Sequence, residues 1–520
     1  MTRRTLRLGL LSALLAGASG CASVGPEEAL APAAVPGDWA AVSARMSGTA
    51  PVTGDWIAEL GDPAVTALAA EALAYNNDLA GAGARVRGVL AQARIARSQL
   101  LPQIGFGLDA TRTRSPGGAR LVGGQLVTTG GYVNDFSSTF SLQWQLDVWG
   151  RLTDQTRAAY LSVEAQELDF AAAALSVAGN TAQAYYGLLA TRLQRELSGR
   201  DVETGEANLR IIERRYERGL SSSLDVRLAR ASLAQSRAQA IAQAQAEREA
   251  ARQLEVLLGR YPSATLTAEG ELPSVEGLAG AEGGAGLGDP IALLSRRPDV
   301  LAAERRLKAQ GFQVDAARKA LLPSLQLTAF AVENENNQVV TGADGVPRLD
   351  KADFMEALDF DNVFARLVGG VSAPVFQGGR LKAQVKAERS QLEASVYDYA
   401  QTVLDAYRQV EDAIAADAYL DAQLTARRLA FEEAEAAEAL TERQYLNGTA
   451  NVFDLISAQQ RRIASESQFI TASQARLVNR VDLYMALGAP FAVPAFERAG
   501  TERFTPPERD PEPSPAREET

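Results

Sequence analysis

Few residues in this sequence have the type and spacing that chemistry at an active site requires. The 520-residue chain contains no histidine, which excludes histidine-based catalytic triads and histidine-ligated metal sites. Its one cysteine, Cys21, excludes a disulfide framework. Since no nucleophile–base constellation or phosphate-binding glycine loop is evident either, the sequence predicts a protein that is not an enzyme and binds no metal or cofactor.

Cys21 follows a segment with the features of an export signal. Arg3, Arg4 and Arg7 precede an apolar stretch from Leu8 to Ala18, and small residues lead from there to Cys21. This resembles a bacterial lipoprotein signal, formed by residues 1–20, in which the cysteine receives covalent lipid and becomes the new N-terminus. Ordinary secretory cleavage beside an incidental cysteine is the alternative.

Acidic residues form the second notable group. The net charge of −12 argues against nucleic acid as a partner, because phosphate contacts need a basic face. Glu435, Glu438 and Glu442 are spaced i, i+3 and i+7, which places them on one face of a helix. Such a face is ordinarily just solvated. In a three-fold tube it would form stacked acidic rings, so these three residues are a candidate lumenal gate.

Two similar turns form the third group. Gly219 and Gly448 suit a left-handed helix C-cap, and Ser222 with Asp225, like Asn451 with Asp454, has the spacing of a capping box. Helix capping alone would explain both turns; docking of a partner's helical tips is the functional alternative. The candidate docking residues are Gly219, Leu220, Ser221, Ser222, Ser223, Leu224, Asp225 and Val226 in the first turn, and Gly448, Thr449, Asn451, Val452, Asp454 and Leu455 in the second.

The two turns belong to a chain that repeats itself. Matching landmarks lie first 221 and then 229 positions apart: Leu101-Pro102 with Leu322-Pro323, Gly150-Arg151 with Gly379-Arg380, Asp225 with Asp454, and Leu258-Gly259 with Leu487-Gly488. An offset held for about 110 residues allows no net insertion, which is typical of helices packed in register rather than of globular loops.

Each repeat contains a pair of expected strands. From Ser138 to Val148 apolar and polar residues alternate strictly, and the expected partner is Ile104–Ala110, across a Gly/Ser/Thr-rich loop at 114–134. The second repeat offers Leu325–Ala331 and Val363–Val375, separated by a polar loop at 333–361. Such strands fit a transmembrane barrel, although a half-buried soluble hairpin would show the same alternation.

Long helices follow the strands. Residues 151–218 contain no proline and would reach roughly 100 Å as one helix. A seven-residue period, typical of a coiled coil, is formed by Leu161, Leu168, Leu175, Ala182 and Leu189, and again by Leu392, Tyr399, Ala406, Ala413 and Leu420. After the signal no apolar run approaches the roughly 20 residues of a membrane helix, so a membrane span would have to be a β-barrel. Four strands cannot close one, but three copies supplying twelve can.

These features together resemble the TolC-like outer-membrane efflux proteins, in particular the lipoprotein branch paired with resistance-nodulation-division pumps. The resemblance covers residues 21–490 and is carried by Cys21, Trp56 to Pro63, Asn77-Asp78-Leu79, Ser295 to Val300, both Leu-Pro pairs and both turns. It implies a homotrimer with a twelve-stranded barrel in outer-membrane lipid and an α-helical tube in the periplasm. It also implies that the tips of the tube meet a periplasmic membrane-fusion adaptor linked to an inner-membrane efflux pump.

The expected fold class is accordingly an α+β membrane protein: a long antiparallel α-helical coiled-coil barrel plus a four-strand contribution to a trimeric β-barrel, with internal duplication. The expected domains are a signal (1–20), a lipid-anchored segment (21–61), a first repeat (62–289), a second repeat (290–490) and a disordered tail (491–520). The first repeat contains a β-hairpin (103–149), a helical hairpin (151–259) and an equatorial linker (260–289); the second contains a β-hairpin (324–376) and a helical hairpin (380–488).

The leading functional hypothesis is passive export of small molecules, such as drugs and toxic compounds, with energy supplied by the pump. A duct for polypeptides and a periplasmic coiled-coil scaffold are the alternatives.

Overall fold

The computed structural model describes residues 40, 56–122, 125–273, 293–336, 338–341, 347–350, 355, 358 and 363–489. The described residues divide into two compact units. Those of the first unit lie within 88–163 and 305–396, and those of the second within 31–87, 164–304 and 397–520. Each unit therefore draws matched parts from both halves of the chain.

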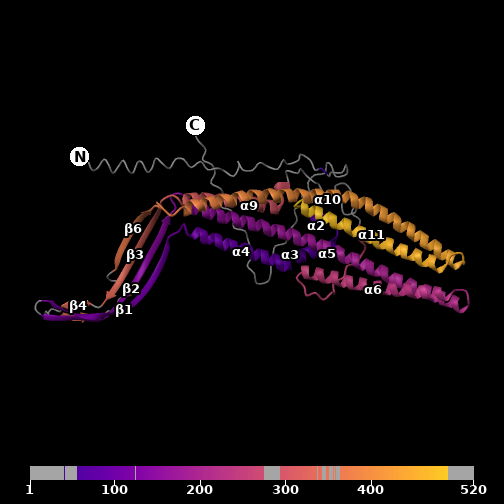
Figure 1. Ribbon diagram of the computed structural model, residues 1–520, viewed down its shortest axis with the longest axis horizontal. Coiled ribbons are helices and arrows are strands. Elements are labelled where there is room, and N and C mark those ends of the chain that lie inside the picture. Colours follow the sequence, from indigo (N-terminus) through magenta and orange to yellow (C-terminus); the bar gives the residue numbers. More distant parts are fainter. Residues whose placement is uncertain are drawn as a thin grey trace, which may run out of the picture. The chain divides into compact units, whose positions relative to one another are not determined.

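Three helices of the first half have a counterpart of equal length in the second half (Figure 1). The pair α4 (Asn77–Ser98) and α9 (Pro298–Lys319) has 22 residues in each helix, starting 221 positions apart. The pair α5 (Arg151–Glu217) and α10 (Arg380–Leu446) has 67 residues in each, and the pair α6 (Ser223–Leu257) and α11 (Val452–Ala486) has 35, all starting 229 positions apart. The sequence offsets are thus confirmed as a repeat of structure. The predicted boundary between repeats, at 289/290, lies outside the described residues and stays a prediction.

The first unit contains a four-stranded antiparallel sheet in the order β1-β2-β3-β6. Its strands are β1 (Gln103–Val122), β2 (Gln125–Leu146), β3 (Ser324–Asn336) and β6 (Phe364–Ser372). A small hairpin of β4 (Gln338–Thr341) and β5 (Pro347–Asp350) follows β3. All four predicted strands are therefore present, and two sequential hairpins supply them.

The strand boundaries differ from those expected. The predicted loop at 114–134 was wrong, because β1 and β2 remain paired through it to Val122 and Gln125, with one irregularity between Ser115 and Gly118. The ladder uses backbone groups, so a run rich in Gly, Ser and Thr does not by itself end a strand. The predicted loop at 333–361 likewise contains the end of β3 and the β4–β5 hairpin. Strand β6 ends at Ser372 rather than Val375, shortly before Pro374, which has no backbone N–H to donate.

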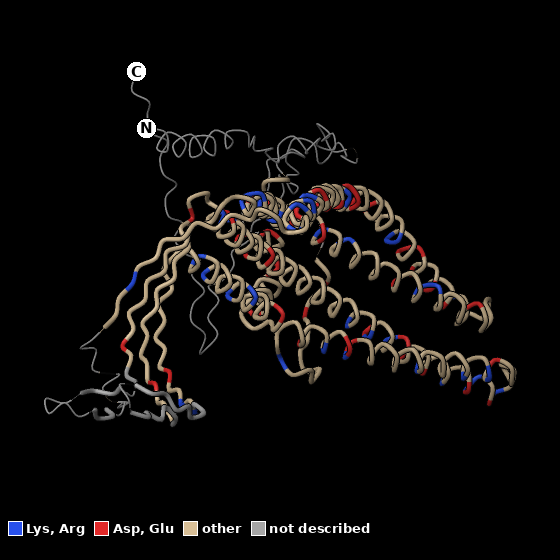
Figure 2. The backbone as a smooth tube through the Cα atoms, turned by 60° about the vertical axis from the view of Figure 1, so that its left-hand side comes forward, with Lys and Arg blue, Asp and Glu red and all other residues tan. Residues whose placement is uncertain are grey.

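The two faces of the sheet differ in polarity. Ile104, Leu142, Ala329 and Leu367 are cross-strand partners and form one apolar row over all four strands. The next row, on the opposite face, is mixed and contains Gly105, Ser141, Phe330 and Arg366. Among the described residues no helix is both long and apolar enough to cross a membrane. Charged residues are sparse along the described strands and frequent, with both signs, along the helices (Figure 2).

The second unit is built around a helical core. Its short helices α2 (Trp56–Glu59) and α3 (Pro63–Tyr75) are followed by the start of α4, and Asp62 caps α3 by accepting from the Ala64 and Val65 amides. The Trp56 ring stacks on Tyr484 of α11 with 5.6 Å between centroids. In the predicted seven-residue series Leu175, Ala182 and Leu189 are buried on α5, as are Ala406 and Ala413 on α10. The coiled-coil pattern thus marks the true packing seam along this part of each helix.

Candidate functional site

The two predicted helical turns have the expected capping geometry. Gly219 and Gly448 adopt left-handed φ values of 72° and 80°, which favour glycine because a side chain would crowd the backbone there. Ser222 accepts from the Asp225 amide while Asp225 accepts from the Ser222 amide, and Asn451 with Asp454 repeats the arrangement. Both capping boxes are therefore confirmed, each opening the returning helix of its hairpin.

The turns of the two hairpins pack together within the second unit. A small apolar cluster joins Ile212, Val226 and Ala229 of the first hairpin to Tyr445, Val452 and Leu455 of the second. The Arg215 guanidinium lies 5.0 Å from the centroid of the Tyr445 ring and donates to the Tyr445 carbonyl at 3.5 Å. Burial raises the pKa of the Tyr445 phenol above its ordinary value of 10.0. The cluster holds the two turns as one end surface of this unit.

This packing divides the predicted docking residues into two groups. Val226, Val452 and Leu455 are buried in the cluster, so they stabilise the turns and are not exposed to a partner. The exposed members are Gly219, Leu220, Ser222, Ser223, Leu224, Gly448, Thr449, Asn451 and Asp454, while Ser221 and Asp225 are half-buried. Phe453, which the sequence reasoning did not select, is 66% exposed. Phe453 lies 229 positions after Leu224, a predicted docking residue, so the sequence repeat alone could have identified it.

The acidic stripe is not uniform. Glu435 and Glu442 are exposed, but Glu438 is half-buried and forms an ion pair with Arg462 of α11. Arg462 also pairs with Glu466 at 2.6 Å, and Glu466 pairs with Arg200 of α5 at 2.5 Å, so one charge network links three helices. Burial raises the pKa of Glu438 against the opposing effect of Arg462, with Glu442 and Asp201 raising it further.

The ion pair could have been found from the sequence. Residues equidistant from the turn of a helical hairpin face each other, and Glu438 and Arg462 each lie 12 positions from Ala450. The first hairpin has the same relation: Glu213 pairs with Arg230 and Glu206 with Arg237, each at 2.7 Å. Glu438 therefore differs from Glu435 and Glu442 in having an arginine partner, and a lumenal gate formed by these three residues stays a prediction.

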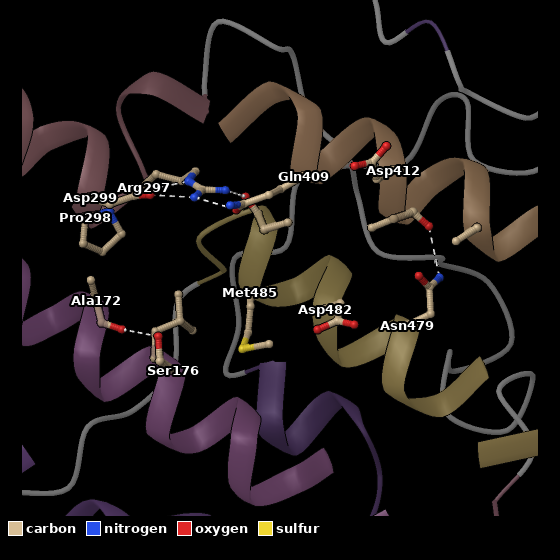
Figure 3. Close-up of a pocket in the computed structure, with 14 residues that line it drawn as sticks. Ala172, Ser176, Arg297, Pro298, Asp299, Gln409, Asp412, Asn479, Asp482 and Met485 are labelled. Carbon is tan, nitrogen blue, oxygen red and sulfur yellow. Dashed lines mark hydrogen bonds and ion pairs between the residues drawn. The ribbon is translucent and has the colours of Figure 1, made fainter. Parts of the chain in front are cut away.

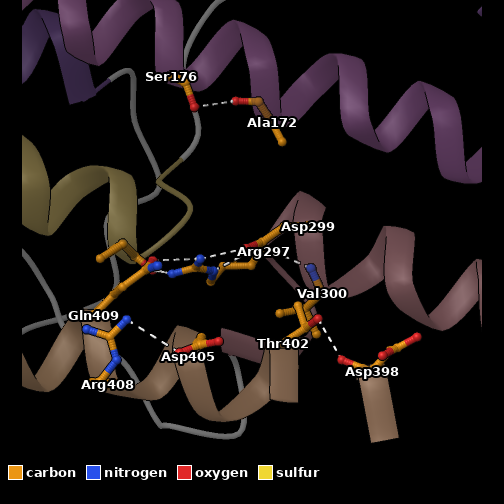
Figure 4. Close-up of polar contacts among 11 residues, drawn as sticks. Ala172, Ser176, Arg297, Asp299, Val300, Asp398, Thr402, Asp405, Arg408 and Gln409 are labelled. Carbon is orange, nitrogen blue, oxygen red and sulfur yellow. Dashed lines mark hydrogen bonds and ion pairs between the residues drawn. The ribbon is translucent and has the colours of Figure 1, made fainter. Parts of the chain in front are cut away.

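Arg297 lies directly before α9 in the second unit, and its guanidinium bonds to three other residues (Figures 3 and 4). It forms two bonds to Asp299, of 3.0 and 2.6 Å, and donates to the Ala486 carbonyl and to Gln409 Oε1, both at 2.9 Å. The pKa of Asp299 is lowered, because the hydrogen bonds and charge of Arg297 outweigh the effect of burial. One guanidinium thus joins the start of α9 to α10 and to the C-terminal end of α11.

A cavity of about 640 Å³ lies beside Arg297 and is lined by α5, α10 and α11 as well (Figure 3). Asp482 lines it and accepts from Gln183 at 2.6 Å, and burial raises the Asp482 pKa. Among the residues described, no group of three or more Asp, Glu, Cys or His side chains is arranged to hold a metal ion. Cys21, with the predicted signal and the tail at 491–520, lies outside the described residues.

Comparison with known proteins identifies relatives over most of the chain. A family model described as outer membrane efflux protein matches residues 68–260 and 290–489. The chain is 30% identical to the pyoverdine export outer membrane protein OpmQ of Pseudomonas aeruginosa, over 92% of this chain and 96% of that protein. It is 29% identical to the toluene efflux pump outer membrane protein TtgF of Pseudomonas putida, over 92% and 95%.

Solved structures share the fold. The CmeC outer membrane channel of Campylobacter jejuni superposes with a TM-score of 0.74 at 21% sequence identity, over 89% of this chain and 94% of that one. The predicted fold class, long helices with a four-strand contribution and an internal duplication, is therefore confirmed.

Proposed function

Since this chain belongs to the outer membrane efflux protein family, we propose that it forms the outer-membrane part of a tripartite export system. It is an outer-membrane efflux channel. The alternative hypothesis of a periplasmic coiled-coil scaffold is therefore rejected. In our proposal a periplasmic adaptor docks on it, an inner-membrane pump supplies the energy, and the chain itself provides an aqueous path without catalysis. The observation that carries this proposal is the pair of capped, mutually packed helical turns with exposed apolar residues.

We propose that three copies assemble. Strands β1 and β6 are the edges of the sheet among the described residues, and each edge leaves backbone donors and acceptors without a partner. Pairing β1 of one copy with β6 of the next removes both edges, and three copies give about twelve strands, above the eight at which barrels begin. The apolar row through Ile104 and Leu367 then faces lipid.

The docking surface for the adaptor consists of the exposed turn residues Leu220, Leu224 and Phe453 with the small polar groups around them. Their side chains are 66, 63 and 66% exposed, so the two turns present three large apolar groups to a partner. A double change, Leu224→Ser with Phe453→Ser, should abolish chemical cross-linking to the adaptor while leaving the oligomer intact. Leu429→Ser, at a 57% exposed position away from the turns, is the matched control. If the double variant still cross-links as well as the control, the turns do not carry docking.

The lipid anchor and the gate are separate proposals. Labelling with radioactive palmitate should disappear in Cys21→Ser, and label retained by that variant would exclude Cys21 as the anchor. For the gate, Glu435→Ala combined with Glu442→Ala should reduce cation preference in planar bilayers, since both carboxylates are exposed. Unchanged ion selectivity would exclude an acidic ring at these positions.

The proposed cargo is small molecules. Relatives are named for pyoverdine export and toluene efflux, so both a polar and an apolar compound occur among the cargoes of similar channels. Deleting the gene in its host should therefore raise accumulation and toxicity of small compounds. A secretion defect confined to a polypeptide would instead favour a protein duct.

A further inference from the structure

A cavity of about 330 Å³ lies in the first unit where strands β2, β3 and β6 meet the helices. Its wall includes Trp149, Arg151, Lys319 and Arg380. Arg151 and Arg380 are the first residues of α5 and α10 and occupy equivalent positions in the two repeats. The duplication has therefore brought two guanidinium groups to one cavity.

The cavity has unneutralised positive charge. Its one carboxylate, Asp147, caps α5 by accepting from the amides of Leu152 and Thr153 at 2.9 and 2.7 Å and from the Thr153 hydroxyl at 2.7 Å. Lys319 is ion-paired to Asp154.

The two arginines bond only to neutral groups. Arg151 donates to Gln145 and Gln155, at 3.3 and 3.4 Å, and Arg380 donates to Gln377. Within the described part of the chain neither guanidinium has a carboxylate partner, so the cavity presents two cations to whatever enters it.

The rim of the cavity is apolar on the side of the strands. Next to lining residues Pro374 and Gln377, Val375 and Phe376 are 95 and 89% exposed. The Trp149 ring is fixed at the cavity wall because its indole N–H donates to the Pro323 carbonyl at 2.6 Å. Exposed apolar side chains, an indole ring and cations therefore occur together at this cavity. Proteins combine such groups where hydrocarbon gives way to lipid headgroups.

We propose that Arg151 and Arg380 bind the phosphate of an anionic glycerophospholipid in this cavity, with its acyl chains along Phe376 and the apolar face of the sheet. The guanidinium fork matches phosphate oxygens in geometry and charge. A free phosphate ion would use the arginines but would gain nothing from the exposed apolar rim, which is why the occupant is a lipid. A volume of about 300 Å³ is sufficient for a small polar ligand such as a phosphoglycerol group. The proposal rests on the proposed function, in which the strands lie in the membrane.

The test is native mass spectrometry of the full-length oligomer in detergent, titrated with dioleoyl phosphatidylglycerol or with dioleoyl phosphatidylcholine as the zwitterionic comparison. Each Arg near a membrane surface contributes about a fivefold gain in binding. Arg151→Gln with Arg380→Gln should therefore weaken phosphatidylglycerol binding about 25-fold, whereas Arg151→Lys with Arg380→Lys should restore most of it. Arg389→Gln removes one exposed charge of α10 outside the cavity and should change binding little.

Three results would overturn the proposal: equal binding of the two lipids by the wild-type protein, an equal loss in Arg389→Gln, or full displacement of the lipid by inorganic phosphate at the lipid's own concentration. Planar-bilayer conductance of the same samples separates this inference from the proposed function. If the wild-type protein forms channels but shows no lipid preference, only the lipid site is refuted. If it forms no channels, the proposed function itself is refuted.

Discussion

Replacing Arg297 by alanine should destabilise the helical core of the second unit by about 3 kcal/mol. The guanidinium is only 8% exposed, and its bonds to the Ala486 carbonyl and to Gln409 are each of the charged kind that contributes about 1.5–3 kcal/mol. The pair with Asp299 adds less, about 0–1 kcal/mol, because that carboxylate is 41% exposed and screened by water. Water entering the vacated space recovers part of this sum.

Arg296 provides a matched control for this change. It is the neighbouring residue of the same type, and its side chain has none of these bonds, so Arg296→Ala should change the free energy of unfolding by less than about 0.5 kcal/mol. Arg297→Lys keeps the charge but cannot reach three partners at once, and should lose about half as much as Arg297→Ala.

The assay is denaturant unfolding in detergent, followed by far-UV circular dichroism and by tryptophan fluorescence, since Trp56 lies in the same core. The lowered pKa of Asp299 means that its contribution is present above its unfolded pKa and is lost as the pH falls through the folded pKa. The difference between wild type and Arg297→Ala should shrink in acid accordingly. If Arg297→Ala unfolds at the same denaturant concentration as Arg296→Ala, the reasoning about this residue is wrong.

Three further changes test other parts of the structure. Gly259→Ala should lower the free energy of unfolding by about 2–4 kcal/mol, because a Cβ at φ 72° would lie 2.4 Å from the Tyr75 carbonyl oxygen. Gly219→Ala has the same φ but open space around the Cβ, and should cost only about 1 kcal/mol. Equal denaturation midpoints of the two variants would contradict this. Glu255→Gln should destabilise the chain at neutral pH, because buried Glu255 accepts from the Ala264, Thr265 and Leu266 amides, and these bonds outweigh burial and lower its pKa. This contribution to stability is present above about pH 4.5 and is lost as the pH falls through the folded pKa. If wild type and Glu255→Gln have the same midpoint of acid unfolding, this assignment is refuted. The pH dependence due to Glu438 should have the opposite sign, because burial raises its pKa. The stability due to its protonation is complete below about pH 4.5 and is lost as the pH rises through the folded pKa. The free energy of unfolding of Glu438→Gln should not show this decrease with rising pH.

The helices were largely predictable from the sequence. The predicted helical hairpins, 151–259 and 380–488, begin at the first residues of α5 and α10 and end two residues beyond α6 and α11. The offset of 229 is unbroken because a helix packed in register tolerates no insertion. The glycine caps and capping boxes were predictable for a local reason: their bonds are formed by residues three positions apart.

The remaining features depend on contacts between distant residues. The length of β1 and β2 comes from pairing of backbone groups, which composition does not report. Tyr216 and Tyr445 are equivalent in sequence, yet Tyr216 is 49% exposed and Tyr445 is buried, because only Tyr445 meets the facing hairpin. Glu438 likewise differs from Glu435 and Glu442 through one partner, Arg462, on the returning helix.

The central claim is that three copies of this chain build one channel. Electron microscopy of the purified full-length protein in detergent or nanodiscs tests it directly. We expect a three-fold symmetric particle with one continuous lumen, in which each copy contributes four strands and two helical hairpins. A monomer, a two-fold particle or a three-fold particle with a separate pore in each copy would contradict the claim.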